Sequence, residues 1–123
     1  MGVIALTQKN FDEVTQTNHC VIVDFWAPWC SPCLTFAKIF EKLSEKHPDI
    51  IFASVDIDKE PELADDFTIK AVPYLIIFRE EFVIFAESGV QTEQGLEQLL
   101  AEAKKIKIED LRKQIQESPH SNS

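Results

Sequence analysis

The side chains best suited to chemistry in this sequence are two cysteines in the stretch Trp29-Cys30-Ser31-Pro32-Cys33. An apolar run typical of a buried strand ends just before them, and a helical pattern begins at Ser31. Cys30 is therefore expected at a helix N-terminus, where free N–H groups and the helix dipole stabilise a thiolate. Because the thiolate attacks in thiol–disulfide exchange, Cys30 is the predicted nucleophile. Cys33 lies in the first turn, near enough to resolve a mixed disulfide, and Pro32 suits that turn because its missing N–H is not needed there.

A third candidate is Asp24, which interrupts the run Cys20-Val-Ile-Val-Asp-Phe-Trp26. A carboxylate inside a buried strand is unfavourable unless it is paired or protonated, so desolvation should raise its pKa. A carboxyl with a raised pKa beside a dithiol is a plausible general acid or base. The alternative is a structural, hydrogen-bonded aspartate.

The elements that must position these residues follow from the hydrophobic pattern. Periodicity predicts strands over 20–26, 50–57, 74–78 and 82–85, with an edge strand at 3–6. Helices are predicted over 10–17, 31–46, 61–67 and from Thr92 onward. Strands alternate with helices and end in a hairpin, which indicates an α/β domain with a central mixed sheet flanked by helices on both faces.

The residues around the cysteines resemble the thioredoxin family. The stretch from Val23 to Cys33 resembles that family's active-site signature, and Ile69-Lys-Ala-Val-Pro73 resembles the segment before its cis-proline. The resemblance covers residues 3–105 and implies the thioredoxin fold. It also implies roles for individual residues: Cys30 as the attacking thiol, Cys33 as the resolving thiol, Asp24 as the proton-transfer group, Pro73 as the cis-proline, Val72 as the backbone partner of the substrate, and Trp29 as the flank of the docking groove.

Several positions depart from the commonest family pattern. Ser31-Pro32 stands where Gly-Pro is usual, and Tyr74, where a threonine is typical, is expected to reshape the groove. Leu34 and Ser54 replace frequent lysines, and Lys38 replaces a kinking proline. Loss of the two lysines is expected to leave the Asp24 anion and the Cys30 thiolate less stabilised. Trp26 is expected to pack beneath the active site.

Composition excludes some partners. The net charge of −9 argues against nucleic acid and anionic membranes. No apolar stretch approaches the roughly 20 residues of a membrane span, and no secretory signal is evident. With three cysteines, the chain is typical of a cytoplasmic protein with a working pair and a spare, Cys20. A zinc site would need Cys20 or a histidine beside the pair; Cys20 should lie roughly 20 Å away, so neither a metal nor a small-molecule cofactor is expected.

The domain assignment is a thioredoxin-like domain over 1–105, a helical extension over 106–116 and a flexible tail over 117–123. An apolar stripe of Ile108, Leu111 and Ile115 indicates that the extension either lengthens the last helix or adds a short helix docked on the domain. Partner binding or dimerisation is the alternative to the expected monomer.

The sequence therefore predicts a protein disulfide reductase that acts through Cys30 and Cys33, with a thioredoxin reductase as the expected electron donor. Two alternatives remain: the same site run as an oxidase or isomerase, since direction depends on potential, or a non-catalytic module that docks proteins.

Overall fold

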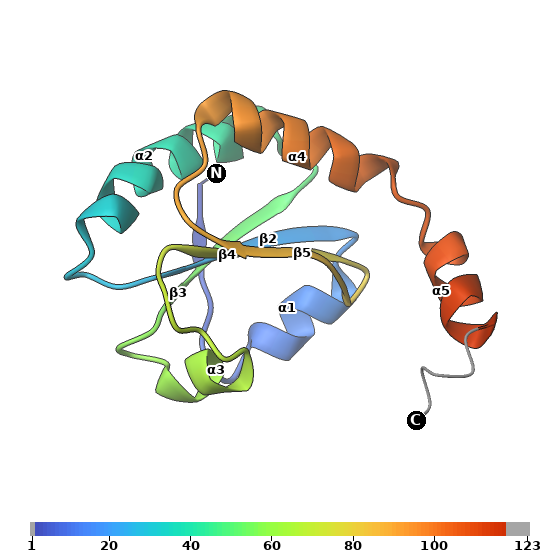
Figure 1. The fold of residues 1–123 in the computed structure, drawn as a ribbon, viewed down its shortest axis with the longest axis horizontal. Helices are drawn as coiled ribbons and strands as arrows, with labels where there is room; N and C mark the ends of the chain where they lie inside the picture. Colours follow the sequence, from blue (N-terminus) through green and yellow to red (C-terminus); the bar gives the residue numbers. More distant parts are fainter. Residues whose placement is uncertain (1, 118–123) are drawn as a thin grey trace.

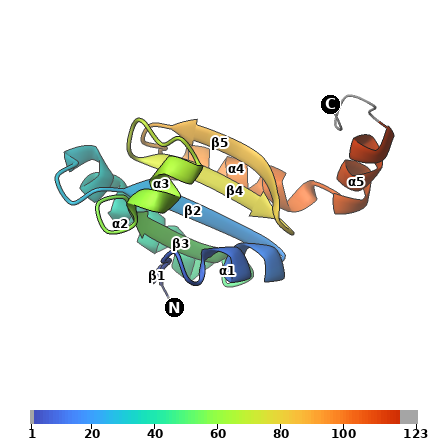
Figure 2. The ribbon, with the colours of Figure 1, turned by 90° about the horizontal axis from the view of Figure 1, so that it is seen from below.

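The computed structural model describes residues 2–117, with side chains through Gln114, and arranges them as helices on both faces of a central sheet (Figures 1 and 2). The elements in chain order are β1 (Ile4–Ala5), α1 (Phe11–Thr17), β2 (Cys20–Trp26), α2 (Ser31–Lys46), β3 (Ile51–Asp56), α3 (Pro61–Asp66), β4 (Tyr74–Arg79), β5 (Phe82–Ser88), α4 (Glu93–Lys105) and α5 (Ile108–Glu117). The predicted α/β architecture, a mixed sheet flanked by helices, is confirmed.

The sheet has five strands in the order β1-β3-β2-β4-β5. β2 lies at its centre, parallel to β3 and antiparallel to β4. All of its residues except Trp26 are buried, which explains why the run reads as apolar on both faces. The central strand thus carries Asp24 into the interior and delivers the chain to the cysteines at its carboxyl end.

Alternate residues of β2 divide between two cores. Ile22 packs with the large side chains of α2 and α4, whereas Val21, Val23 and Phe25 pack with those of α1 and α3. Phe36, Phe40 and Leu43 of α2 are almost fully buried on the first side. The orientation of α2 over β2 is therefore fixed by packing along its whole length.

The hairpin at the sheet edge is longer than predicted. β5 continues to Ser88 instead of ending near residue 85, because Glu87 and Ser88 pair with Leu75 and Tyr74 of β4. Polar residues on an exposed edge strand contribute backbone hydrogen bonds but no apolar signal. The other predicted boundaries lie within one residue of the observed ones, and the extension forms a helix of its own, α5, which is one of the two predicted arrangements.

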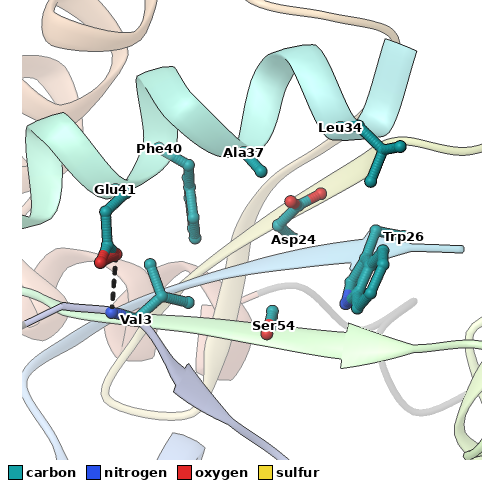
Figure 3. Close-up of a pocket in the computed structure, with 8 residues that line it drawn as sticks. All are labelled: Val3, Asp24, Trp26, Leu34, Ala37, Phe40, Glu41 and Ser54. Atoms are coloured by element: carbon teal, nitrogen blue, oxygen red, sulfur yellow. Dashed lines mark hydrogen bonds between the residues drawn. The ribbon is translucent and has the colours of Figure 1, made fainter. Parts of the chain in front are cut away.

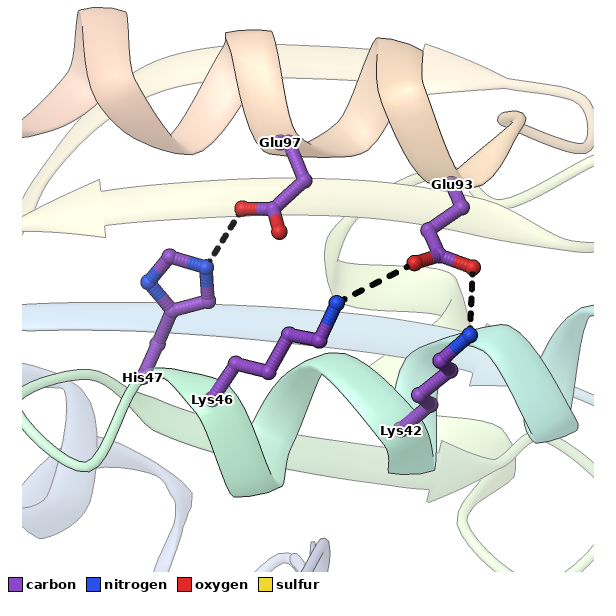
Figure 4. A network of polar contacts seen from close by, with 5 residues as sticks. All are labelled: Lys42, Lys46, His47, Glu93 and Glu97. Carbon is purple, nitrogen blue, oxygen red and sulfur yellow. Dashed lines mark hydrogen bonds and ion pairs between the residues drawn. The ribbon is translucent and has the colours of Figure 1, made fainter.

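α4 begins at a capped end above α2. The Thr92 hydroxyl accepts a hydrogen bond from the Gly95 N–H at 2.9 Å. Figure 4 shows Glu93 and Glu97 of α4 facing two lysines of α2 and His47, the residue that follows α2. His47 Nε2 lies 2.6 Å from Glu97 Oε1. These contacts are largely exposed, so burial of Leu96 and Leu100 provides most of the attachment.

Removing the Thr92 cap should destabilise the protein measurably. We expect Thr92→Ala to lower the free energy of unfolding by about 1 kcal/mol, because the Gly95 N–H loses its acceptor at the helix end. Thr92→Ser keeps an acceptor and is the matched control. Urea unfolding of the three proteins checks this; equal losses for serine and alanine would contradict the capping role.

α5 lies beyond the end of α4, at the side of the sheet where β4 turns into β5 (Figure 2). Ile108 is buried, and the Arg112 guanidinium lies 5.2 Å from the centre of the Phe82 ring. The predicted tail falls outside the described residues, apart from Glu117, which ends α5. None of the helices in residues 2–117 has the length and hydropathy of a membrane-spanning segment.

Candidate active site

The two cysteines lie at the start of α2, where they form a disulfide. Cys30 is the N-cap residue, and its Sγ accepts a hydrogen bond from the Cys33 N–H at 3.1 Å. The exposed fraction is 6% for Cys30 and 1% for Cys33. The sulfur that an external disulfide can reach is therefore that of Cys30, held where the helix end stabilises negative charge.

A segment remote in sequence lies against the disulfide. The carbonyl oxygen of Val72 is 3.7 Å from Cys30 Sγ, and the Val72–Pro73 peptide bond is cis. Pro73 is buried and its carbonyl accepts a hydrogen bond from the Gly89 N–H at 2.9 Å. The fold thus brings together Cys30, Cys33, Val72 and Pro73, four of the residues that the sequence singled out.

The remaining predicted residues differ in their surroundings. Trp29 is 68% exposed, and its indole N–H donates to Asp58 Oδ1 at 3.4 Å. Ser31 and Pro32 are exposed at the start of α2. Tyr74 is half-buried and packs against the core on the α1 and α3 side. Asp58 was not foreseen, because nothing in the acidic stretch after β3 indicates which carboxylate reaches the tryptophan.

Asp24 occupies the interior beneath α2. It is 3% exposed, and burial raises the pKa of its carboxyl group to about 7. No hydrogen-bond partner for Oδ1 exists within the described part of the chain. Figure 3 shows the carboxyl group pointing from β2 towards α2, near Ala37 and above Ser54 of β3. Because Cys33 precedes Ala37 by one helical turn, Asp24 lies under the same face of α2 as the resolving cysteine.

Two of the departures from the family pattern surround this carboxyl group. Ser54 is the β3 residue paired in register with Asp24, and Leu34 of α2 is 49% exposed. Desolvation is the cause of the raised Asp24 pKa, without an opposing contribution from a cation. Trp26 is half-buried at the end of β2 and packs against the cysteines.

Cys20 lies at the opposite end of β2 and is a free, buried thiol. Burial raises its pKa, which keeps the thiol protonated and unreactive. Among the residues that the structure describes, no three histidine, cysteine or acidic side chains gather as a metal site would require.

Comparison with known proteins identifies the family. The sequence model described as thioredoxin matches residues 2–102. The chain belongs to the thioredoxin family. It is 40% identical over 114 residues to a putative thioredoxin 2 from Streptomyces coelicolor, covering 93% of this chain and 85% of that protein. It is also 36% identical to a thioredoxin from Alicyclobacillus acidocaldarius, covering 80% of this chain and 95% of the relative.

Solved structures agree with the sequence relatives. A mutant thioredoxin from Halobacterium salinarum superposes with a TM-score of 0.79 at 29% identity, covering 86% of this chain and 94% of that one. The predicted thioredoxin fold is thereby confirmed. With its Cys30–Cys33 pair, this thioredoxin-family chain is a protein disulfide oxidoreductase whose substrates are disulfides in other proteins. α5 follows the region that the family model matches.

Proposed function

We propose that this thioredoxin-family protein works as a cytoplasmic reductase, with Cys30 as nucleophile and Cys33 as resolving thiol. The Cys30 thiolate attacks one sulfur of a substrate disulfide, which releases the other substrate sulfur as a thiolate and leaves a mixed disulfide. The Cys33 thiolate then attacks Cys30 Sγ and displaces the second substrate sulfur as a thiolate. The substrate leaves with both sulfurs reduced, and the two electrons come from the Cys30–Cys33 dithiol, which becomes a disulfide. The observation that carries this assignment is Cys30 Sγ, the more exposed sulfur, bonded to the Cys33 N–H at the helix end.

Asp24 is the proposed proton acceptor for Cys33. A carboxyl group whose pKa lies near 7 is close to half-ionised at neutral pH, so it can take the thiol proton and later return it. It lies under the face of α2 that bears Cys33, and its exposed fraction is only 3%. This placement favours the general-base role over a purely structural one.

The proposed substrate groove runs past Trp29, Val72, Pro73 and Tyr74. The Val72 carbonyl lies beside Cys30 Sγ, so an extended substrate segment that pairs with the Val72 backbone would bring its own sulfur to the nucleophile. The exposed indole of Trp29 would cover the apolar part of that segment. Ser31, Pro32 and Trp26 would shape the site without reacting.

We further propose that the protein acts as a monomer and that a thioredoxin reductase returns it to the dithiol form. Membership of the thioredoxin family supports that donor. The proposed redox centre is the cysteine pair alone, without a small-molecule cofactor. Leu34 and Ser54 leave the site with fewer cations than the usual pattern, which we expect to tune the thiol pKa and the choice of partner.

The reduction potential of the Cys30–Cys33 pair tests the direction of exchange. We expect a value near −270 mV, in the range of thioredoxin and well below the roughly −180 to −120 mV of the isomerase and oxidase types. Equilibration of the purified protein in graded dithiol/disulfide buffers, followed by alkylation and mass measurement, gives this value. A potential above about −200 mV would contradict a reductase and favour oxidation or isomerisation.

A second measurement separates catalysis from docking. If the protein only docked partners, Cys30→Ser/Cys33→Ser would retain the partner affinity of the dithiol form and the wild type would show no turnover with reductase present. The reductase proposal instead requires multiple turnovers of a disulfide-bonded test protein, such as insulin, with a thioredoxin reductase and its reductant. Absence of turnover with that donor would contradict the proposed electron source.

A further inference from the structure

A pocket of about 330 Å³ opens on the surface between α2, β1 and the carboxyl end of β2. Its walls are apolar and consist mainly of Val3, Trp26, Leu34, Ala37 and Phe40. Figure 3 shows these side chains around a space between the sheet and the helix. The pocket lies beneath the α2 residues that follow Cys33. Asp24 is the lining residue that takes part in the proposed disulfide exchange, but no step of that exchange needs a ligand in the pocket.

Two carboxyl groups line this apolar space. Asp24, itself 97% buried because its exposed fraction is 3%, lies at the inner side with Oδ1 unpartnered among the described residues. Glu41 lies at the outer side, where it is exposed and its Oε2 accepts a hydrogen bond from the Val3 N–H at 3.2 Å. Since Glu41 is one helical turn beyond Ala37, the two carboxyl groups are separated along the α2 axis.

Acceptors at both ends of an apolar space complement a ligand with donors at both ends of an apolar chain. A carboxylate accepts up to about four hydrogen bonds, so Glu41 retains acceptor capacity beyond the Val3 N–H. Asp24 Oδ1 is buried and has no hydrogen-bond donor among the described residues, so the protein itself leaves the charge of this carboxyl group uncompensated. Methylene groups gain free energy from leaving water for apolar walls. The net charge of −9 also attracts cations to the surface.

We propose that this pocket binds an alkane-α,ω-diammonium ion, with one ammonium group on Asp24 and the other on Glu41. The inner ammonium donates to the Asp24 carboxylate and lies beside Ser54, and the methylene chain contacts Leu34, Ala37 and Phe40. The inner ion pair involves a carboxyl group that is only 3% exposed, where an isolated charge is unfavourable but a paired one is stabilised. The occupant therefore supplies the cation that the interior around Asp24 lacks.

The predicted affinity depends on pH in a defined way. Only the ionised Asp24 carboxylate attracts the ammonium group, and its pKa is about 7. Glu41 is the other titratable side chain that lines the pocket, Leu75 and Ser54 flank Asp24 on the neighbouring strands, and Cys33 does not titrate in the disulfide form. An alkylammonium group stays protonated up to about pH 10. Affinity should consequently rise roughly thirtyfold from pH 5.5 to pH 8.

The test uses the full-length oxidised protein and pentane-1,5-diamine, at constant ionic strength, with binding followed by NMR chemical shifts. We expect shifts confined to the pocket residues, a dissociation constant that falls as pH rises, and tighter binding of the diamine than of pentylamine. Shortening the chain by one methylene should weaken binding by about fourfold or less. Asp24→Asn should remove both the inner contact and the pH dependence.

Matched variants separate the two ends of the ligand. Glu41→Gln should reduce the affinity for the diamine to that for pentylamine. Glu45→Gln makes the same change one turn along α2, outside this pocket, and should leave the affinity for the diamine unchanged. Ala37→Leu keeps both carboxyl groups and should block binding by filling the space between them, which covers the case in which Asp24→Asn is poorly folded. All of these readouts are made without a substrate, so they are independent of the proposed direction of exchange.

Three outcomes would overturn the proposal. The first is a dissociation constant that does not change between pH 5.5 and pH 8. The second is equal affinity for the diamine and pentylamine, which would remove Glu41 from the site. The third is a set of shifts spread over the acidic surface and reproduced by Mg²⁺, which would indicate non-specific attraction of cations.

Discussion

Cys30→Ser should lower the rate of protein disulfide reduction by a factor on the order of 10³ or more. Cys30 provides the more exposed sulfur of the pair, and its Sγ accepts the Cys33 N–H hydrogen bond at the end of α2. A serine hydroxyl at this N-cap keeps the helix end satisfied but is not a nucleophile towards sulfur at neutral pH. The fold should therefore survive while the first step of exchange is lost. The rate is measured as the reduction of insulin disulfides by the protein, with dithiothreitol as the reductant that regenerates its dithiol form.

Cys33→Ser should block the second step of exchange and leave the first step intact. Attack by Cys30 remains possible, but the resolving thiol is absent, so the mixed disulfide with the substrate accumulates. We expect mass spectrometry under non-reducing conditions to detect a covalent adduct of one substrate chain with this variant and none with Cys30→Ser. An adduct on Cys33 in the Cys30→Ser protein, in place of this pattern, would contradict the order of attack.

Cys20→Ala is the matched control for both cysteine variants. Cys20 is free, 2% exposed, and lies at the far end of β2 from the disulfide. Its thiol packs among apolar side chains, so its removal leaves a small gap and lowers stability without touching the site. Reduction rates should match those of the wild type at temperatures well below unfolding. A loss of rate comparable to that of Cys30→Ser would show that a cysteine outside the pair takes part.

The parts of the fold that sequence predicts well are those whose side chains are buried on a regular period. β2 and α2 occupy the predicted ranges because every residue of the strand except Trp26 is buried and the apolar residues of the helix fall on one face. Asp24 was recognisable for the same reason: a single carboxylate in an apolar run is conspicuous. The positions of Cys30 and Cys33 at a helix end follow directly from those two elements.

The features that sequence did not reveal depend on contacts between distant segments. Glu41 binds the Val3 N–H across 38 residues, and the indole N–H of Trp29 reaches Asp58 across 29 residues. Neither contact leaves a periodic signal, because the acceptors, Glu41 and Asp58, are carboxylates of a kind that is common on exposed surfaces. The pocket near Asp24 has the same origin, since it exists only where β1, β2 and α2 meet. Local pattern specifies the elements, and their packing creates the binding space.

The free energy of unfolding should depend on pH because Asp24 is buried. Its pKa in the folded state is about 7, against 3.8 when the carboxyl group is fully solvated. Between these values the unfolded chain has lost the proton that the folded protein still holds, so the free energy of unfolding falls as pH rises from about 4 to 7. A shift of this size corresponds to about 4 kcal/mol, complete above the folded pKa. Asp24→Asn is neutral throughout and escapes this loss.

We therefore expect the stability of Asp24→Asn relative to the wild type to grow by about 4 kcal/mol between pH 4 and pH 8, measured by urea unfolding of the oxidised proteins. Taking the difference between the two pH values cancels any constant effect of the asparagine amide. Asp66→Asn, on the exposed surface of α3, makes the same change in charge and should change stability by less than about 0.5 kcal/mol. A relative stability that stays constant with pH would show that Asp24 is solvated.

Stability and activity of Asp24→Asn should move in opposite directions. A general base contributes a factor on the order of 10² or more to a proton transfer, so the variant should resolve mixed disulfides more slowly while unfolding at higher urea. A purely structural aspartate would give the gain in stability with an unchanged rate and an unchanged pH–rate profile. The wild-type rate should instead rise through pH 7 as Asp24 ionises. A carboxyl group kept in the interior at the expense of stability is best explained by the proton that it carries, because burial is what brings its pKa to neutrality.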